Sequence, residues 1–292
     1  MQKPVIIGLG ELLWDKFPDH KKPGGAPANV AFNANMLGNA GICVSAVGND
    51  KNGKELLDFL ESVNLSTDYI QTLDDFPTGT VSIEFDGAEP NYTIEENVAW
   101  DGIEWNSDLE MLSKKASAVC FSTLSQRSKK SRETIHRFLD STVDECYKVL
   151  DLNLRPPFID FEVIQQSLYK ANVVKVNEQE LEQLSHMLET DSIEKVIFDE
   201  FGVKLLCVTL GQKGSSFITQ TESIIDAAPK VDSKNGDVVG VGDAFISCII
   251  HHLVKSTSLK DMLKKANRFA SYMVTKKGAM NTVPSSLLEE VS

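Results

Sequence analysis

Short apolar runs alternate with longer amphipathic stretches along most of the chain. The short runs have the length of buried strands, and the longer stretches repeat their apolar positions with the period of a helix. The pattern predicts strands at Val5–Leu9, Cys43–Val47, Ala118–Ser122, Lys148–Leu152, Val173–Val176 and Leu205–Thr209. It predicts helices at Ala28–Leu37, Lys54–Val63, Ser131–Val143, Glu178–Leu188, Ser192–Glu200, Ala244–Val254 and Leu259–Thr275. Alternating strands and helices favour a parallel sheet covered by helices, with binding sites at the carboxyl ends of the strands.

One region breaks this alternation. Residues Thr80–Phe85 and Asn91–Ile94 alternate apolar with polar positions, as two strands do, and the segment Asp86–Pro90 between them has the composition of a turn. A hairpin that projects from an α/β body can act as a lid, which excludes water during group transfer. A plain edge hairpin has the same pattern, so both interpretations stay open at this point.

Composition and charge narrow the classes of partner. Of the 292 residues, 42% are apolar, which supports a packed core in one large α/β domain or two small ones. The net charge of −13 argues against a nucleic-acid partner, because a phosphate backbone needs a basic surface. It leaves ATP open, since local N–H groups, a few cations and a metal ion can hold a nucleotide. No apolar stretch reaches about 18 residues, so no membrane partner is expected.

The cysteines and histidines predict no metal site. The five cysteines form no Cys-x-x-Cys pair and lie mostly in apolar segments, which predicts buried free thiols in a reducing cytoplasm. The adjacent His251 and His252 would point in different directions on a helix, and the other histidines are scattered, so zinc is not expected. The apolar part of the first eight residues is too short for a signal peptide.

The segment from Gly240 to Asp243 points most directly to chemistry. Its two glycines allow a tight turn and a close approach to a ligand, and the apolar run that follows is predicted to be helical. The first turn of a helix offers unpaired N–H groups and the positive end of the dipole, which suit a phosphate. Asp243 would then take a proton from a hydroxyl while these N–H groups hold the phosphoryl group that the hydroxyl attacks. The alternative is an acid that only caps the helix.

Two segments near the N-terminus suit a polyhydroxylated ligand. Pro27 fits a first helical turn, which places Asn29 beside exposed N–H groups, and an amide both donates and accepts hydrogen bonds. Asp15 lies just past the first strand, where it can accept bonds from sugar hydroxyls. The segment Gly8–Asp15 fails the dinucleotide pattern G-x-G-x-x-G, because Leu13 takes the place of the third glycine. A loop before a helix and a solvated surface acid are the alternatives.

Two further strand ends carry polar side chains. Glu180 follows the strand Val173–Val176 and could serve Mg²⁺, with Asn177 orienting a water, although dipole compensation explains an acid there equally well. Alternation along a strand would put Asp151, Asn153 and Arg155 on one side, and an arginine at a strand end neutralises phosphate charge.

In this order, the segments resemble the ribokinase-like carbohydrate kinases, the PfkB family, and within it the fructokinase branch. The segments are Gly10-Glu11 with Asp15, Gly24 to Asn29, Asp151-x-Asn153-x-Arg155, Asn177 to Glu180, Thr209 to Gly214, and Gly240 to Asp243. The resemblance implies one α/β domain over residues 1–292, a three-layer αβα sandwich with a mainly parallel central sheet and a small β lid built mainly from residues 78–96. It implies phosphorylation of a sugar by ATP with Mg²⁺, and in the fructokinase branch the conversion of D-fructose to fructose 6-phosphate.

The resemblance also implies roles for single residues. Asp243 would be the base, and the N–H groups of Gly240, Val241 and Gly242 would form the anion hole. The sugar-binding residues would be Asp15, Gly25, Asn29 and Arg155. The ATP-binding residues would be Asn177, Thr209, Gly211, Gly214, Asn267 and Gly278, and Glu180 would hold Mg²⁺ through water. The segment Asn97–Asp101 either lines the sugar pocket or leaves Trp100 in the core.

The chain departs from the family pattern D-T-x-G-A-G-D at two positions. Val238 replaces a threonine and loses a hydroxyl, and Val241 replaces an alanine inside the anion-hole turn. Activation by a monovalent cation such as K⁺ is therefore left open. So are a relative's acceptor (ribose, ketodeoxygluconate, a nucleoside or a phosphosugar), a non-catalytic sensor of sugar or nucleotide, and a homodimer formed through the lid.

Overall fold

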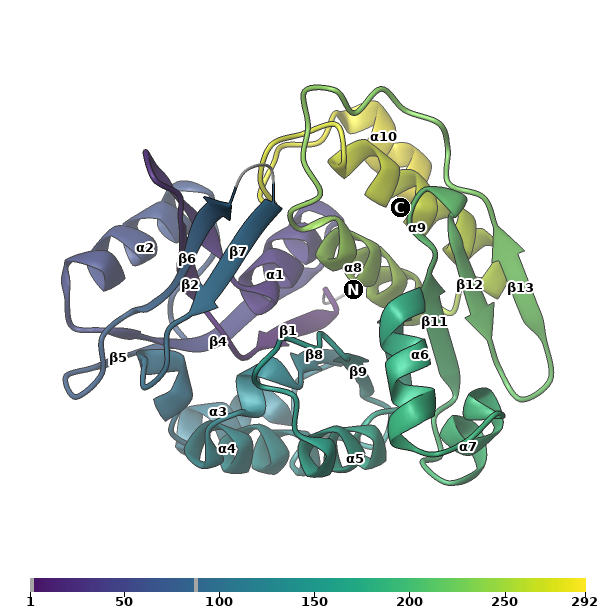
Figure 1. Ribbon diagram of the computed structural model, residues 1–292, viewed down its shortest axis with the longest axis horizontal. Coiled ribbons are helices and arrows are strands. Elements are labelled where there is room, and N and C mark those ends of the chain that lie inside the picture. The colour runs from purple at the N-terminus through teal and green to yellow at the C-terminus, as the bar shows by residue number, and fades with distance from the viewer. Residues whose placement is uncertain (1–2, 87–88) are drawn as a thin grey trace.

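The structure of the chain is a computed structural model that describes residues 3–86 and 89–292 (Figure 1). In the described part of the chain, a large sheet of nine strands has the order β13-β12-β11-β10-β9-β8-β1-β4-β5. The strands are β1 (Val5–Leu9), β4 (Ala40–Gly48), β5 (Ile70–Leu73), β8 (Ala118–Ser122), β9 (Tyr147–Asp151), β10 (Val173–Asn177), β11 (Leu205–Thr209), β12 (Ser215–Ile218) and β13 (Ser223–Asp226). Neighbouring strands are parallel except for β12, which is antiparallel to both β11 and β13.

All six predicted strands are confirmed, because they are central strands with both faces covered. Such strands have continuous apolar runs that a sequence pattern shows plainly. The pattern did not predict β5, β12 and β13, which lie at or next to the edges of the sheet and leave more side chains partly exposed.

Helices cover both faces of the large sheet, as the three-layer prediction requires (Figure 1). One layer holds α3 (Ser107–Ser113), α4 (Lys129–Asp140), α5 (Phe161–Lys170), α6 (Glu178–Met187) and α7 (Ile193–Asp199). The other holds α1 (Ala26–Met36), α2 (Lys51–Ser62), α8 (Val241–Leu253), α9 (Leu259–Met273) and α10 (Ser285–Val291). All seven predicted helices are present with shifted ends, and α3, α5 and α10 were not predicted.

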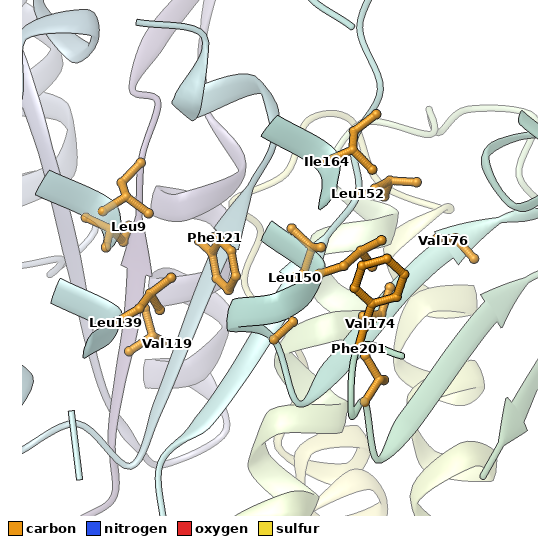
Figure 2. Packing of buried hydrophobic residues seen from close by; sticks show 14 of the residues in the cluster. Leu9, Val119, Phe121, Leu139, Leu150, Leu152, Ile164, Val174, Val176 and Phe201 are labelled. Atoms are coloured by element: carbon orange, nitrogen blue, oxygen red, sulfur yellow. The ribbon is translucent and has the colours of Figure 1, made fainter. Parts of the chain in front are cut away.

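The core follows the alternation of side chains along the strands. On β8, Phe121 packs with the α3–α7 layer, whereas Cys120 packs with the α8–α10 layer. Figure 2 shows the first of these clusters, in which Leu9, Leu150 and Val174 come from neighbouring strands of the sheet. Each fully buried side chain of this kind contributes about 1.5–3 kcal/mol. This packing fixes the strand ends on which the candidate site is built.

A second, smaller sheet lies beside the main one. Its strands are β2 (Leu13–Lys16), β3 (Lys21–Gly24), β6 (Gly79–Asp86) and β7 (Glu89–Ile94), in the order β3-β2-β6-β7. The predicted hairpin is therefore confirmed as β6 and β7, while residues 87 and 88 of its turn lie outside the described residues. The strands β2 and β3 were not predicted, and Asp15, expected just past the first strand, lies within β2. How far the chain forms one domain with a lid stays a prediction.

Arg127 anchors the exit of the small sheet to the body. Its Nε and Nη2 donate to the two carboxylate oxygens of Asp101 at 2.8 Å, and Nη2 also donates to the carbonyl oxygen of Glu95. The guanidinium lies 3.9 Å from the ring centroid of Trp100 and 4.5 Å from that of Phe158. Trp100 is completely buried, so it belongs to the core under the lid.

Two absences were examined in the residues that the structure describes. None of the helices there is long and apolar enough to cross a bilayer. No group of three or more histidine, cysteine, aspartate or glutamate side chains within 3–86 and 89–292 is arranged to hold a metal ion.

Candidate functional site

The candidate site is built around the first turn of α8. Gly240 occupies the N-cap position with a φ of 72°, a left-handed conformation that favours glycine. A methyl group at this position would lie 2.2 Å from Cβ of Ala279, so no larger residue fits. Gly240 has no side chain to cap the helix, and the Val241 N–H makes only a long bond of 3.4 Å to the carbonyl oxygen of Val238. The N–H groups of this turn can therefore bind an anion.

Asp243 lies in this turn beside a residue from the other end of the chain. Nδ2 of Asn29, in the first turns of α1, donates to Oδ2 of Asp243 at 2.7 Å across 214 positions of sequence. Burial raises the pKa of Asp243 to about 7, as does repulsion by Asp151, while the Asn29 hydrogen bond and Lys175 oppose the rise. A carboxylate with a pKa near neutrality is well matched to accept a proton from a hydroxyl. The two motifs singled out in the sequence thus meet at one point.

Asn29 also carries an unused hydrogen-bond acceptor. Its side chain is only 4% exposed, and among the described residues Oδ1 is a buried atom without a partner. A buried acceptor without a donor costs about 1–3 kcal/mol. A ligand hydroxyl next to Asp243 would remove this cost, so the amide fits the polyhydroxylated ligand expected from the sequence.

Asp15 and the glycine pair before α1 form the other wall. A methyl group on Gly24 would lie 2.6 Å from Oδ2 of Asp15, so the carboxylate lies directly over this turn. Gly25 has a φ of 113°, and a methyl group there would lie 2.4 Å from the carbonyl oxygen of Glu11. Burial raises the pKa of Asp15 to about 6, and the positive charge of Lys22 opposes that rise. The arrangement offers a carboxylate and close backbone access to a small ligand.

Lys175 is a site residue that the sequence analysis missed. It lies in β10 with 9% exposure, and its Nζ donates to Oδ1 of Asp151 at 3.0 Å. The same Nζ is 3.5 Å from where a methyl group on Gly242 would lie, so the ammonium borders the first turn of α8. Burial alone would lower the pKa of Lys175, but attraction by Asp151, Glu180 and Asp243 raises it above its ordinary value. A lone lysine within the apolar run Val173–Val176 was the available signal.

The expected alignment of Asp151, Asn153 and Arg155 along one strand is wrong. The strand β9 ends at Asp151, and Asn153 has a φ of 45°, so the side-chain alternation does not continue. Asp151 and Asn153 are buried, whereas Arg155 is exposed, with Nη1 donating to the carbonyl oxygen of Leu154. The Leu152 backbone causes the break, since its carbonyl accepts from the Thr123 hydroxyl and its N–H donates to Lys175.

Asn177 and Glu180 form a reciprocal cap at the start of α6. The Glu180 N–H donates to Oδ1 of Asn177 at 2.8 Å, and the Asn177 N–H donates to Oε2 of Glu180 at 2.9 Å. Oε1 of Glu180 accepts from the Leu154 N–H at 3.1 Å. Each carboxylate oxygen keeps a further lone pair, so a water-mediated contact to Mg²⁺ fits better than direct ligation.

The remaining predicted nucleotide residues are spread over the β11–β13 and α9 region. Thr209 ends β11, and Gly211 and Gly214 flank the short turn that follows it. Asn267 is 4% exposed and fully engaged, since Oδ1 accepts from Ser215 and Nδ2 donates to the carbonyl and carboxylate oxygens of Asp226. As placed, Asn267 braces this wall and has no amide hydrogen left for a base.

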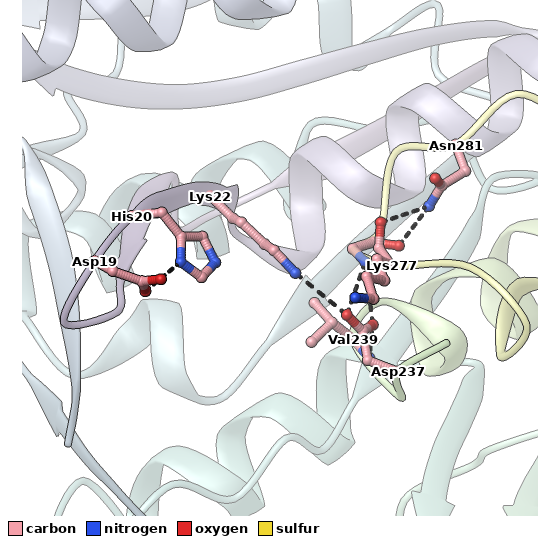
Figure 3. Close-up of polar contacts among 8 residues, drawn as sticks. Asp19, His20, Lys22, Asp237, Val239, Lys277 and Asn281 are labelled. Atoms are coloured by element: carbon pink, nitrogen blue, oxygen red, sulfur yellow. Dashed lines mark hydrogen bonds and ion pairs between the residues drawn. The ribbon is translucent and has the colours of Figure 1, made fainter. Parts of the chain in front are cut away.

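Gly278 lies at the Asp237 turn, which does not fit a bound monovalent ion. Figure 3 shows that the carboxylate of Asp237 accepts from the Gly278 and Val239 N–H groups and from the ammonium of Lys22. The adjacent Val238 is 78% exposed and offers no side-chain oxygen. An exchangeable K⁺ is therefore not expected at this carboxylate.

Comparison with known proteins gives one consistent family. The family model of pfkB family carbohydrate kinases matches residues 11–286. A putative sugar kinase of Pyrococcus horikoshii is 30% identical, with 95% of this chain and 92% of the relative covered. An ATP-dependent 6-phosphofructokinase of Thermoanaerobacterium thermosaccharolyticum is 29% identical (97% and 92% covered), and a probable fructokinase of Arabidopsis thaliana is 28% identical (97% and 95% covered).

A solved structure shows the same fold. The fructokinase of Xylella fastidiosa with bound ATP superposes with a TM-score of 0.87 and 22% sequence identity. The match covers 99% of this chain and 98% of that one.

Proposed function

Because the chain belongs to the pfkB family of carbohydrate kinases, we propose that it transfers the γ-phosphoryl group of ATP to a hydroxyl of D-fructose, giving fructose 6-phosphate. The observation that carries the proposal is the contact between Asn29 and Asp243 at the open first turn of α8. It places a base, a hydroxyl-binding amide and an anion-binding turn at one point. The carbohydrate kinase follows from the family, and fructose is the finer step.

The proposed reaction uses Asp243 as the base. The sugar oxygen bonds to the γ-phosphorus, the bond from that phosphorus to the β–γ bridging oxygen breaks, and Asp243 takes the hydroxyl proton. The N–H groups of Gly240, Val241 and Gly242 bind the phosphoryl oxygens, on which charge develops during transfer. Lys175 adds a fixed positive charge beside the same turn, 3.5 Å from the position of a methyl group on Gly242.

A divalent ion is proposed on grounds of charge. The carboxylates of Glu11, Asp151, Glu180 and Asp243 act on one another or on Lys175 around this turn, so the phosphates of ATP enter a largely acidic site. Mg²⁺ bound to those phosphates would supply the missing positive charge, and Glu180 with Asn177 would hold its waters. The absence of a cage made by protein side chains alone among the described residues agrees with an ion held largely by nucleotide and water.

The proposed acceptor contacts come from Asp15, Gly25 and Asn29. Asp15 and the free Oδ1 of Asn29 accept bonds from sugar hydroxyls, and Gly25 lets the chain pass close to the ring. Arg155 stays a prediction for the acceptor's far end, since its exposed side chain is directed to no described partner except the Leu154 carbonyl. Thr209, Gly211, Gly214 and Gly278 are proposed to border ATP.

The lid, the compartment and the oligomeric state complete the proposal. The small sheet, which Arg127 anchors, would cover the acceptor during transfer. The five cysteines are free and buried, which supports a reducing cytoplasm as the setting. A homodimer through the lid stays a prediction.

Sugar-dependent release of ADP tests the proposed function. We expect ADP formation from ATP and Mg²⁺ with D-fructose, at a kcat/KM above that with ribose, ketodeoxygluconate, nucleosides or fructose 6-phosphate. A coupled assay across this panel measures it. No ADP with any acceptor would remove the catalytic proposal, and tight binding without turnover would favour a sensor. Preference for fructose 6-phosphate, as the 29% identical 6-phosphofructokinase suggests, would replace fructose by a phosphosugar.

The pH dependence of kcat/KM tests the role of Asp243. Its pKa of about 7 predicts that kcat/KM falls by about tenfold per unit as the pH drops below 7, because only the ionised carboxylate accepts a proton. Below about 6 the protonation of Asp15 adds to the loss if that carboxylate binds the sugar. A steady-state profile from pH 5 to 9 measures it, and a rate that stays flat down to pH 5 would contradict the assignment.

A further inference from the structure

Lys22 joins two parts of the site that are far apart in the sequence. It lies on β3, two residues before Gly24, and its Nζ donates to Oδ2 of Asp237 at 3.3 Å (Figure 3). Both side chains are 28% exposed, so water screens this pair less than an ordinary surface salt bridge. The contact connects the small sheet to the turn that opens α8.

Asp237 gathers main-chain donors from two segments. The Val239 N–H donates to Oδ1 at 3.1 Å, and the Gly278 N–H lies 3.1 and 3.0 Å from the two carboxylate oxygens. The Asp237 N–H in turn donates to the carbonyl oxygen of Lys276 at 2.8 Å. Asp237 therefore holds the turn before α8 and the segment 276–278 in one arrangement, with Lys22 as its charged partner.

This arrangement supports the anion-binding turn directly. The backbone at Gly240 lies against Ala279, since a methyl group on Gly240 would be 2.2 Å from the Ala279 Cβ. The residue after Gly278 thus packs behind the residue that opens α8. A change in the Asp237 hub would move the support of the first-turn N–H groups.

The same lysine also faces the acceptor side. In the antiparallel pair of β2 and β3, Lys22 is directly opposite Asp15. Directly opposed residues of such a pair project from the same face of the sheet. The ammonium of Lys22 therefore lies between the carboxylate proposed to bind the sugar and the carboxylate that orders the phosphate-binding turn.

We propose that Lys22 acts as a built-in monovalent cation, which ties the acceptor-binding strands to the phosphate-binding turn without an exchangeable ion at Asp237. The proposal deepens the proposed function and rests on it for the identity of the two ligands. Lys22 is a positioning residue, because it acts on the phosphoryl group through Asp237 and the turn. The tie itself is a property of the folded chain and can be measured without turnover.

Hydrogen exchange and ADP binding in the variant Lys22→Met test this tie. We expect peptides covering residues 237–243 and 274–281 to exchange at least about fivefold faster than in the wild type. We also expect ADP to bind about fivefold more weakly by calorimetry when tetramethylammonium is the monovalent cation in the buffer. Added K⁺ or ammonium should restore much of this loss, because a small free cation can then approach Asp237. Wild-type affinity should be the same with either cation.

Two further variants keep the test specific. Lys21→Met removes the neighbouring ammonium, which contacts Glu55 and Asn52 instead, and should leave exchange and ADP affinity unchanged. Lys22→Arg keeps a cation and should remain independent of K⁺. Normal exchange and ADP affinity in Lys22→Met, or a wild type that needs K⁺ to bind ADP, would overturn the proposal; the wild-type comparison decides the matter even if the methionine variant fails to fold. A failure of the sugar panel with these results intact would count against the proposed function alone.

Discussion

Replacing Asp243 with asparagine is expected to lower kcat by about 10²–10⁴-fold, with little change in ADP affinity. Asparagine has nearly the same shape and can still accept the hydrogen bond that Asn29 donates at 2.7 Å, so the turn should keep its geometry. It cannot take a proton from the sugar hydroxyl, and this single loss accounts for the expected effect. Steady-state kinetics with fructose, together with calorimetry of ADP binding, measures the two quantities separately.

The same variant is expected to be more stable than the wild type at pH 8. The pKa of Asp243 rises from 3.8 to about 7 in the folded chain, so its contribution to stability is fully present below 3.8 and is lost as the pH rises through about 7. Asparagine removes this loss, which should add on the order of 1–4 kcal/mol to the free energy of unfolding at pH 8 and less at pH 5.5. Urea unfolding at the two pH values measures the difference.

A matched control is available at the start of α9. Asp261 occupies the third position of that helix, as Asp243 does in α8, but is exposed. Asp261→Asn should leave kcat unchanged and give no gain in stability between pH 5.5 and 8. Turnover near the wild-type value in Asp243→Asn would remove that residue from the role of base.

The second large effect is expected at the buried pair of Lys175 and Asp151. Lys175→Met should lower the free energy of unfolding by about 3–5 kcal/mol, because it leaves the carboxylate of Asp151 buried without its partner. It should also lower kcat, since the positive charge beside the first turn of α8 is lost. Urea unfolding and steady-state kinetics on the same preparation measure both effects.

The controls for this prediction use one surface pair and one double variant. Lys170 contacts Asp140 at 2.6 Å, but both side chains keep considerable exposure, so Lys170→Met should cost no more than about 1 kcal/mol. In Asp151→Leu with Lys175→Met, much of the stability should return, because no buried charge remains unpaired, while kcat should stay low. If Lys175→Met alone is as stable as Lys170→Met, the pair is not the buried element described here.

The strands that the pattern predicted and those it missed differ in their source of stability. The strands β1, β8 and β11 lie in the interior of the sheet and are almost wholly apolar, so their own residues indicate their structure. By contrast, β3 consists of Lys21, Lys22, Pro23 and Gly24, which favour no strand by themselves. It is a strand because it pairs with β2, which in turn pairs with β6 more than sixty positions later. Local composition cannot express such a long-range contact.

The candidate site divides in the same way. The sequence by itself determined the fold class and the residues whose type carries the chemistry, among them Asn29 and Asp243, because glycines and polar groups at strand and helix ends have few other uses. Only the tertiary structure decided that these two side chains touch, and that Lys175, in an apolar run taken for core, borders their turn. It also decided that Arg155 does not follow Asp151 along a strand. The physical reason is that the pKa values, the ion pairs and the close backbone approaches of the site depend on distances between segments up to 215 residues apart, which tertiary packing alone sets.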